Sequence, residues 1–174
     1  KAEEYIEKAK EMGESLGGVV ETIYKNVPKG LGSYVQYDRK LDAKIAMAVM
    51  SIQAIKGVEI GKGFDCAKEF GSKVHDEILY DGKFTRRTNN AGGINGGITN
   101  GMPIIFRCAV KPTPTISKPQ NTINFKTMEN TKLLAGGRHD PCIVHRARVV
   151  VDSITAIVLC DILSGRFGTD WLVK

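Results

Sequence analysis

The chain has 174 residues, of which 42% are hydrophobic and 25% charged, proportions typical of a globular domain with a packed core. Its formal net charge is +6 and its pI is about 9.1, so the excess of lysine and arginine serves either solubility or an anionic ligand such as a phosphate, a carboxylate or a nucleic acid. No window of the sequence is densely basic and only 7% of the residues are aromatic, which argues against a nucleic-acid binder.

The cysteine and apolar patterns narrow the class of protein further. The four cysteines form no Cys-x-x-Cys pair and the three histidines do not stand at zinc spacing from them, so we expect reduced, mostly buried thiols, no metal site and a cytoplasmic protein. The longest apolar region, Val149 to Leu163, is interrupted by polar residues, and we expect neither a membrane span nor a signal peptide.

The first segments predict a helix followed by a strand. The helix is already under way at Lys1, which suggests a piece of a longer protein, and Gly17 and Gly18 would end it. Its apolar face would comprise Tyr5, Ile6, Ala9, Met12 and Leu16. Val19 to Val27 alternates apolar and polar residues, as a half-buried strand does, and a loop rich in proline and glycine follows.

A second helix is predicted from Leu41 to Ile55, with Gly57 as its stop. In this prediction Gln53 and Ala54 lie in the last turn of the helix. The next segment, up to Phe64, suggests a strand end or a loop, and Ala67 to Tyr80 fits either a helix or an irregular excursion.

The stretch RTNNAGGINGGITNGMPII, from Arg87 to Ile105, contains five glycines just before an apolar run. Glycine permits positive φ and close approach to the main chain, and successive exposed N–H groups can bind an anion. The spacing is neither a dinucleotide fingerprint nor a P-loop, since no Lys-Ser/Thr pair follows. The sequence leaves two interpretations open: a ligand-binding backbone, or a tight turn with close packing of elements.

Met102 to Val110 predicts the clearest strand, and the proline-rich KPTPTISKPQ that follows can be neither helix nor central strand. Lys111 would stand at the end of the strand, with the hydroxyls of Thr113 and Thr115 nearby. A stiff loop of this kind suits a phosphate or the polar edge of a flavin, and the alternative is a solvated edge. Thr122 to Asn130 is a candidate for a further strand.

GGRHDPC leads into a final helix that extends to about Leu163, with Asp140 as its N-cap and Pro141 at its first position. Arg138 would add positive charge for an oxyanion at the helix N-terminus. Asp140 is either a simple cap or a carboxylate that the neighbouring arginine keeps ionised for proton transfer, and His139 fits a surface histidine. Hairpin-like strands with two or three long helices predict a single α+β domain over residues 1–174.

Four segments in chain order resemble the C-terminal half of the chorismate synthases: LDAKIAMAVMSIQAIKGVEIGKGF, TNNAGGINGGITNG, KPTPTI and GGRHDPC. The resemblance runs from about Gly13 to the helix after Asp140. It implies half of a β-α-β sandwich, with an antiparallel sheet packed on long helices, usually assembled as a homotetramer. It also implies a lyase that converts 5-enolpyruvylshikimate 3-phosphate to chorismate by 1,4-elimination of phosphate and needs reduced FMN.

Carried over motif by motif, the resemblance implies a proton-transfer role for Asp140. The implied FMN contacts are Gln53, Ala54, Gly96, Lys111, Pro112, Thr113, Pro114, Thr115 and Arg138. This chain departs from the family's pattern at two of these places. Gln53 stands where an asparagine is usual, which puts its contact in doubt, and Pro114 and Thr115 replace two serines of the loop. A contact at Pro114 is therefore limited to its ring or its carbonyl.

The family's catalytic histidines and most of its substrate-binding arginines belong to N-terminal motifs that this chain does not contain. We therefore expect the chain alone to be inactive and to bind FMN weakly or not at all. We also expect loops around Gly96, Lys111 and Arg138 to converge on one wall of a flavin pocket. The alternative is a non-catalytic anion-binding or assembly module with the same fold, but the intact KPT and RHDP segments favour the enzyme.

Overall fold

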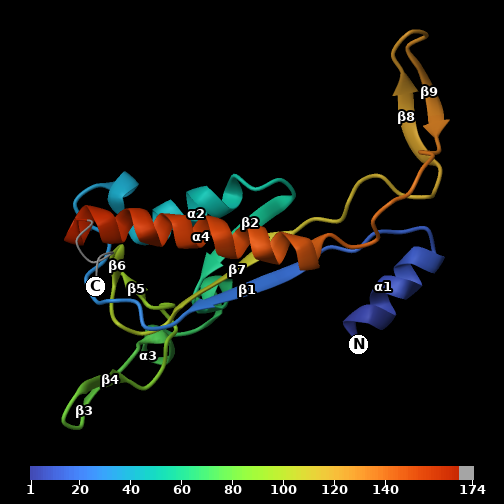
Figure 1. The fold of residues 1–174 in the computed structure, drawn as a ribbon. Coiled ribbons are helices and arrows are strands. Elements are labelled where there is room, and N and C mark those ends of the chain that lie inside the picture. The colour runs from blue at the N-terminus through green and yellow to red at the C-terminus, as the bar shows by residue number, and fades with distance from the viewer. Residues whose placement is uncertain (169–174) are drawn as a thin grey trace.

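The computed structural model describes residues 1–168 and shows helices covering one face of a small antiparallel sheet, with three hairpins around it (Figure 1). The helices are α1 (Ala2–Glu11), α2 (Leu41–Met50), α3 (Gly71–Val74) and α4 (Val144–Phe167), with 3-10 turns at Tyr37–Arg39 and Gly63–Lys68. The strands are β1 (Gly18–Tyr24), β2 (Ile55–Ile60), β3 (Ile78–Tyr80), β4 (Phe84–Arg86), β5 (Ile94–Asn95), β6 (Ile98–Thr99), β7 (Ile104–Val110), β8 (Gln120–Asn124) and β9 (Glu129–Leu133).

The sheet has the strand order β1-β7-β2, and both pairings are antiparallel. Strand β7 is central because Thr22 of β1 and Ile60 of β2 both pair with Phe106. The side chains of β7 alternate between the two faces of the sheet, as the pleat of a strand requires. Its inward positions are fully or almost fully buried: Ile104, Phe106, Cys108 and Val110.

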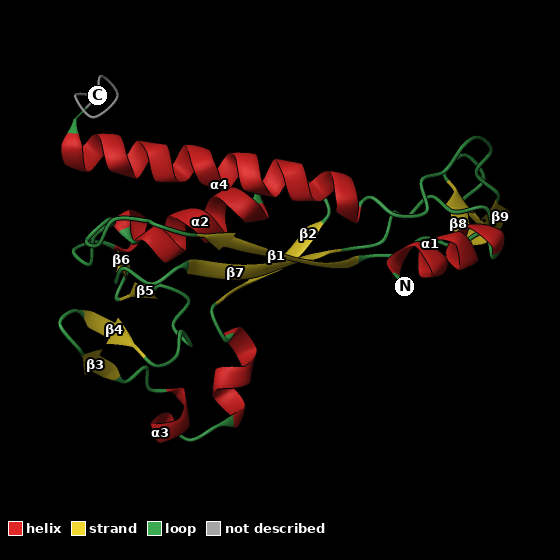
Figure 2. Ribbon diagram, turned by 60° about the horizontal axis from the view of Figure 1, so that its bottom comes forward, coloured by secondary structure: helices red, strands yellow, loops and turns green. Residues whose placement is uncertain are grey.

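Helices α2 and α4 lie against this buried face (Figure 2). From α2, Ile45 and Val49 enter the core, and from α4, Val151 and Leu159 do so. The predicted α+β class, with an antiparallel sheet packed on long helices, is therefore confirmed. The opposite face of α4 exposes Val149, Val150 and Ile157, and no helix within residues 1–168 is long and apolar enough to span a bilayer.

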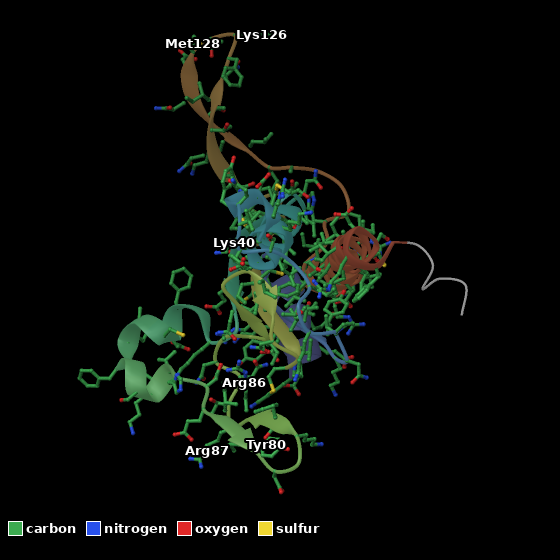
Figure 3. The ribbon with its side chains drawn as sticks, turned by 90° about the vertical axis from the view of Figure 1, so that its left-hand side faces the viewer. Lys40, Tyr80, Arg86, Arg87, Lys126 and Met128 are labelled. Carbon is green, nitrogen blue, oxygen red and sulfur yellow. The ribbon has the colours of Figure 1, made fainter. Side chains whose placement is uncertain are left out.

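The hairpin of β8 and β9 stands away from the body of the molecule (Figure 1). Its strand residues are exposed apart from the half-buried Gln120, and its tip carries the exposed side chains of Phe125 and Met128. Figure 3 shows Lys126 and Met128 at this tip, far from Tyr80 and Arg86 of the β3–β4 hairpin. The single strand predicted from Thr122 to Asn130 is therefore wrong: this segment comprises the end of β8, a turn and the start of β9.

Two predicted helices end earlier than the sequence suggested. Helix α1 ends at Glu11 and Gly13 has φ +67°, so Leu16 lies outside the helix and forms a parallel bridge with Cys142. Helix α2 ends at Met50 and not at Ile55, which is already the first residue of β2. Gly57 is therefore a strand residue, opposite Ala109, and does not stop a helix.

The start of the last helix was also predicted wrongly. Helix α4 begins at Val144, and Asp140 is not its N-cap. The amide of Leu16 donates to the carbonyl of Pro141 at 2.7 Å, and the Leu16–Cys142 bridge keeps this segment extended. The carboxylate of Asp140 instead accepts from the amide of Cys142, which leaves the helix to begin later. Of the four cysteines, only Cys108 and Cys142 are buried, so the expectation of mostly buried thiols holds for half of them.

The glycine-rich stretch is the β5–β6 hairpin with its flanking turns, and all five glycines have positive φ. A Cβ at Gly93 would lie 2.4 Å from the carbonyl oxygen of Pro103, and one at Gly97 would lie 2.7 Å from that of Ser33. At Gly96 a Cβ would meet nothing within 4 Å. Close packing therefore explains Gly93 and Gly97, whereas Gly96 is needed only for its φ of +59°.

We expect Gly97→Ala to destabilise the protein by about 3 kcal/mol, because the new methyl meets the Ser33 carbonyl and adds left-handed strain. The neighbouring Gly96→Ala carries the backbone strain without the overlap and should cost about 1 kcal/mol. Urea unfolding of both variants gives the comparison, and equal losses of stability would contradict the packing explanation.

The start of the glycine stretch is fixed by the buried carboxylate of Asp76. Its Oδ1 accepts from the hydroxyl of Thr88 at 2.6 Å and the amide of Asn90 at 2.8 Å, and its Oδ2 accepts from the amide of Ala91 at 2.9 Å. Burial alone would raise the pKa of Asp76. The hydrogen bonds and the charge of Arg86 outweigh burial and hold this pKa below its ordinary value of 3.8.

A carboxylate with a lowered folded-state pKa stabilises the fold fully above its unfolded pKa, and this contribution is lost as the pH falls through the folded value. We therefore expect Asp76→Asn to cost about 2 kcal/mol at pH 7, with the difference from the native protein shrinking below about pH 4. Urea unfolding between pH 3 and 7 measures this, with the exposed Asp81→Asn as control. A difference that is independent of pH would rule out the ionised carboxylate as its cause.

Candidate functional site

Residues 13–17 connect the two loops that carry most of the candidate site residues. On one side, the hydroxyl of Ser15 donates to the carbonyl of Thr113 at 2.6 Å, and the amide of Ser117 donates to the carbonyl of Gly13 at 3.1 Å. On the other side, Leu16 bonds to Pro141, as described above. The KPTPT loop and the RHDP segment are thus held next to one another through a stretch that sequence reasoning assigned to a helix.

Gly17 makes this close arrangement possible. A Cβ on Gly17 would lie 2.4 Å from the carbonyl oxygen of Val110 and 2.9 Å from Cδ of Pro112. Real side chains do not approach backbone oxygens so closely, so any other residue would push the KPTPT loop away from β1. The Gly17-Gly18 pair in the sequence was the one available signal of this contact.

The turn between α2 and β2 joins the same cluster. The amide of Lys111 donates to the carbonyl of Ala54 at 2.8 Å, which places Ala54 directly beside the start of the KPTPT loop. Ala54 has φ +70°, a left-handed conformation that costs an alanine about 1–2 kcal/mol. Such strained residues concentrate at functional sites, and this one coincides with a candidate FMN contact. Its neighbour Gln53 is exposed.

The KPTPT loop presents one cation and one unsatisfied hydroxyl. The Lys111 side chain is exposed, and within residues 1–168 it has no carboxylate partner. Oγ1 of Thr113 is buried and forms no hydrogen bond with any residue that the structure describes. Pro112, Pro114 and Thr115 are exposed, and the carbonyl of Pro114 accepts from Nε2 of Gln120 at 3.1 Å.

A hollow beside the N-terminus of α4 holds the other charged candidates. It is lined by Arg138, His139, Asp140, Pro141, His145 and Arg146. The ring of His139 bonds to the carbonyl of Ala135 at 3.0 Å through Nε2, whereas the Arg138 side chain is exposed. With two arginines and two histidines around one carboxylate, the hollow favours an anionic ligand.

The carboxylate of Asp140 has a different neighbour at each oxygen, and its buried Oδ2 forms no hydrogen bond with the residues described. Oδ1 accepts from the amide of Cys142 at 3.1 Å, and Oδ2 forms an ion pair with the guanidinium of Arg146. Sequence reasoning did not single out Arg146. The sequence held no signal of this pair, because the contact depends on the late start of α4 at Val144, which local patterns did not predict.

Gly96 lies apart from this cluster. The β5–β6 hairpin precedes the first residue of β7, while Lys111 follows its last residue (Figure 2). At about 3.3 Å per residue, the seven residues of β7 place the two ends of this strand roughly 20 Å apart. Ala54, the KPTPT loop and the RHDP segment therefore come together in this chain, and the structure does not bring Gly96 to them.

The sequence and the fold were compared with known proteins. The family model for chorismate synthase matches residues 1–163. A chorismate synthase from Caldicellulosiruptor bescii is 52% identical over 98% of this chain and 45% of its own length. One from Aquifex aeolicus is 53% identical over 97% of the chain and 42% of its own length. This chain thus spans less than half the length of these relatives.

Comparison of structures agrees with the comparison of sequences. The crystal structure of a chorismate synthase superimposes with a TM-score of 0.79 and 48% identity, covering 96% of this chain and 43% of that one. The sequence and the fold therefore match the family over almost the whole chain. By sequence and by fold, the chain belongs to the chorismate synthase family.

Proposed function

We propose that this chain forms the FMN-contacting part of a chorismate synthase, an enzyme that converts 5-enolpyruvylshikimate 3-phosphate to chorismate and phosphate. Cytoplasmic location and homotetrameric assembly of the full-length enzyme belong to the same proposal. The observation that carries it is a set of contacts: Ala54 bonds to the KPTPT loop, and residues 13–17 connect that loop to the RHDP segment.

The groups in this cluster fit a flavin nucleotide. FMN combines a phosphate with a ring system whose edge carries hydrogen-bonding atoms. Lys111 and Arg138 are exposed cations, and the buried hydroxyl of Thr113 lacks a partner within residues 1–168. A buried hydroxyl left unpaired costs free energy, so a ligand that bonds to Oγ1 recovers it. These residues would hold the cofactor, which when bound supplies reducing power transiently during the elimination.

Asp140 has the features of a proton-accepting group. Its side chain is 26% exposed, the Cys142 amide donates to one carboxylate oxygen, and the guanidinium of Arg146 lies beside the other. An ionised carboxylate in a mostly enclosed position can accept a proton from a bound ligand. Gln53 and Gly96 rest on motif resemblance alone, and their flavin contacts remain predictions.

One observation favours the alternative function, a non-catalytic anion-binding or assembly module. A carboxylate engaged by an arginine is also what a purely structural site would contain. The two functions differ in what Asp140→Asn does to the full-length enzyme. Loss of chorismate formation with FMN binding retained supports the enzyme, whereas unchanged turnover would leave Asp140 a structural role.

We expect Lys111→Ala in the full-length enzyme to raise the dissociation constant of FMN about tenfold, since a charged hydrogen bond contributes about 1.5 kcal/mol or more. Lys126→Ala, at the tip of the β8–β9 hairpin (Figure 3), removes an equal charge far from the cluster and serves as control. Flavin titration under reducing conditions measures both, and equal effects would show that only the overall charge matters.

We expect the 174-residue chain by itself to form no chorismate and to bind FMN weakly or not at all. The side chains of Lys111, Pro114 and Arg138 are exposed, so a ligand held by them would stay open to solvent. The test is an anaerobic assay of the purified chain with reduced FMN and substrate, with the full-length enzyme as positive control. Production of chorismate above background would disprove this expectation.

A further inference from the structure

We propose that Arg146 is a positioning residue of the reaction, which holds the carboxylate of Asp140 in the orientation needed for proton transfer. This inference rests on the proposed role of Asp140. It assigns a function to a side chain of α4 that lies outside all four motifs on which the family resemblance was based.

The structure places two neighbours of Asp140 on different elements, an amide at one oxygen and a guanidinium at the other. The Cys142 amide reaches Oδ1 from the extended segment, and the Arg146 guanidinium reaches Oδ2 from the first turn of α4. Each contact restricts rotation of the carboxylate differently. With only the amide bond left, the side chain could turn about that bond, and its second oxygen would lose its defined position.

Both supports are rigid. The segment from Asp140 to Cys142 is fixed by the hydrogen bond and bridge to Leu16. The amide of Arg146 donates to the carbonyl of Ile143 at 3.1 Å, within the start of a helix of 24 residues packed on the sheet. Because the backbone is held on both sides, only the side-chain freedom of the exposed Arg146 is lost when its guanidinium is held at the carboxylate.

The other charged groups that face Asp140 do not provide the same support. Arg138, His139 and His145 line the same hollow, but among the residues described only Arg146 forms an ion pair with this carboxylate. Histidines change charge near neutral pH, whereas the guanidinium of an arginine stays protonated throughout the working range. Its planar fork can also bind a carboxylate oxygen in a set direction, which an ammonium group does less well.

The test uses the full-length enzyme with three variants: Arg146→Gln, Arg146→Lys and the control Arg148→Gln. Arg148 is exposed on the same helix but lines the groove beside α1 and not the hollow of Asp140. We expect Arg146→Gln to lower kcat at least tenfold with FMN affinity nearly unchanged. Arg148→Gln should match the native enzyme.

The lysine variant keeps the proposal testable if the glutamine variant folds poorly. It retains the positive charge but not the planar guanidinium, so we expect only part of the lost rate to be recovered. Circular dichroism and FMN titration show whether each variant is folded. Native rates in both Arg146 variants would overturn the inference.

A double-mutant cycle separates this inference from the role of Asp140 itself. If Arg146 acts through Asp140, Asp140→Asn combined with Arg146→Gln should be no slower than Asp140→Asn alone. Additive losses would show that Arg146 acts independently and would overturn the inference while leaving Asp140 in place. Full activity of Asp140→Asn would overturn the role of Asp140, together with the inference that rests on it.

Discussion

The position of β7 at the centre of the sheet is the constraint on which the remaining structure depends. Strands β1 and β2 both pair with β7, and the inward side chains of β7 form the part of the core against which α2 and α4 pack. Its two ends lead into the two segments that are richest in special residues, the glycine hairpin before Ile104 and the KPTPT loop after Val110. Because a strand is extended and rigid, these two segments are held apart at a fixed distance, and no adjustment of side chains can join them.

At the carboxyl end of β7, distant parts of the chain meet through backbone contacts. Ala54, Ser15 and Leu16 each form a main-chain or hydroxyl bond to a neighbouring candidate loop. The candidate loops are therefore joined by hydrogen bonds, while the side chains of Lys111 and Arg138 are exposed. This division resembles the general arrangement in which a rigid scaffold presents functional loops.

Local sequence patterns predicted the regular elements well and their ends less well. The alternation of Val19 to Val27 and the apolar run to Val110 predicted β1 and β7, since burial on one face imposes a period of two. The early ends of α1 and α2 and the late start of α4 depend on contacts between distant segments, which local patterns do not encode. The order of the motifs along the chain identified the candidate loops through the family resemblance. The ion pair of Asp140 with Arg146 became visible only in the three-dimensional structure.

The β8–β9 hairpin joins the KPTPT loop to the RHDP segment. Pairing of Gln120 with Leu133 brings the inner ends of the two connecting stretches together, and Gln120 also bonds to Pro114. The hairpin thereby acts as a cross-link between the segments that lead from Lys111 and to Arg138. It shortens the flexible chain between these two residues and so reduces the conformational entropy lost when both are held in place. Changes in length at the tip, between Phe125 and Met128, leave this closure intact, whereas a single-residue insertion below the Gln120–Leu133 pair would alter the spacing of the two loops.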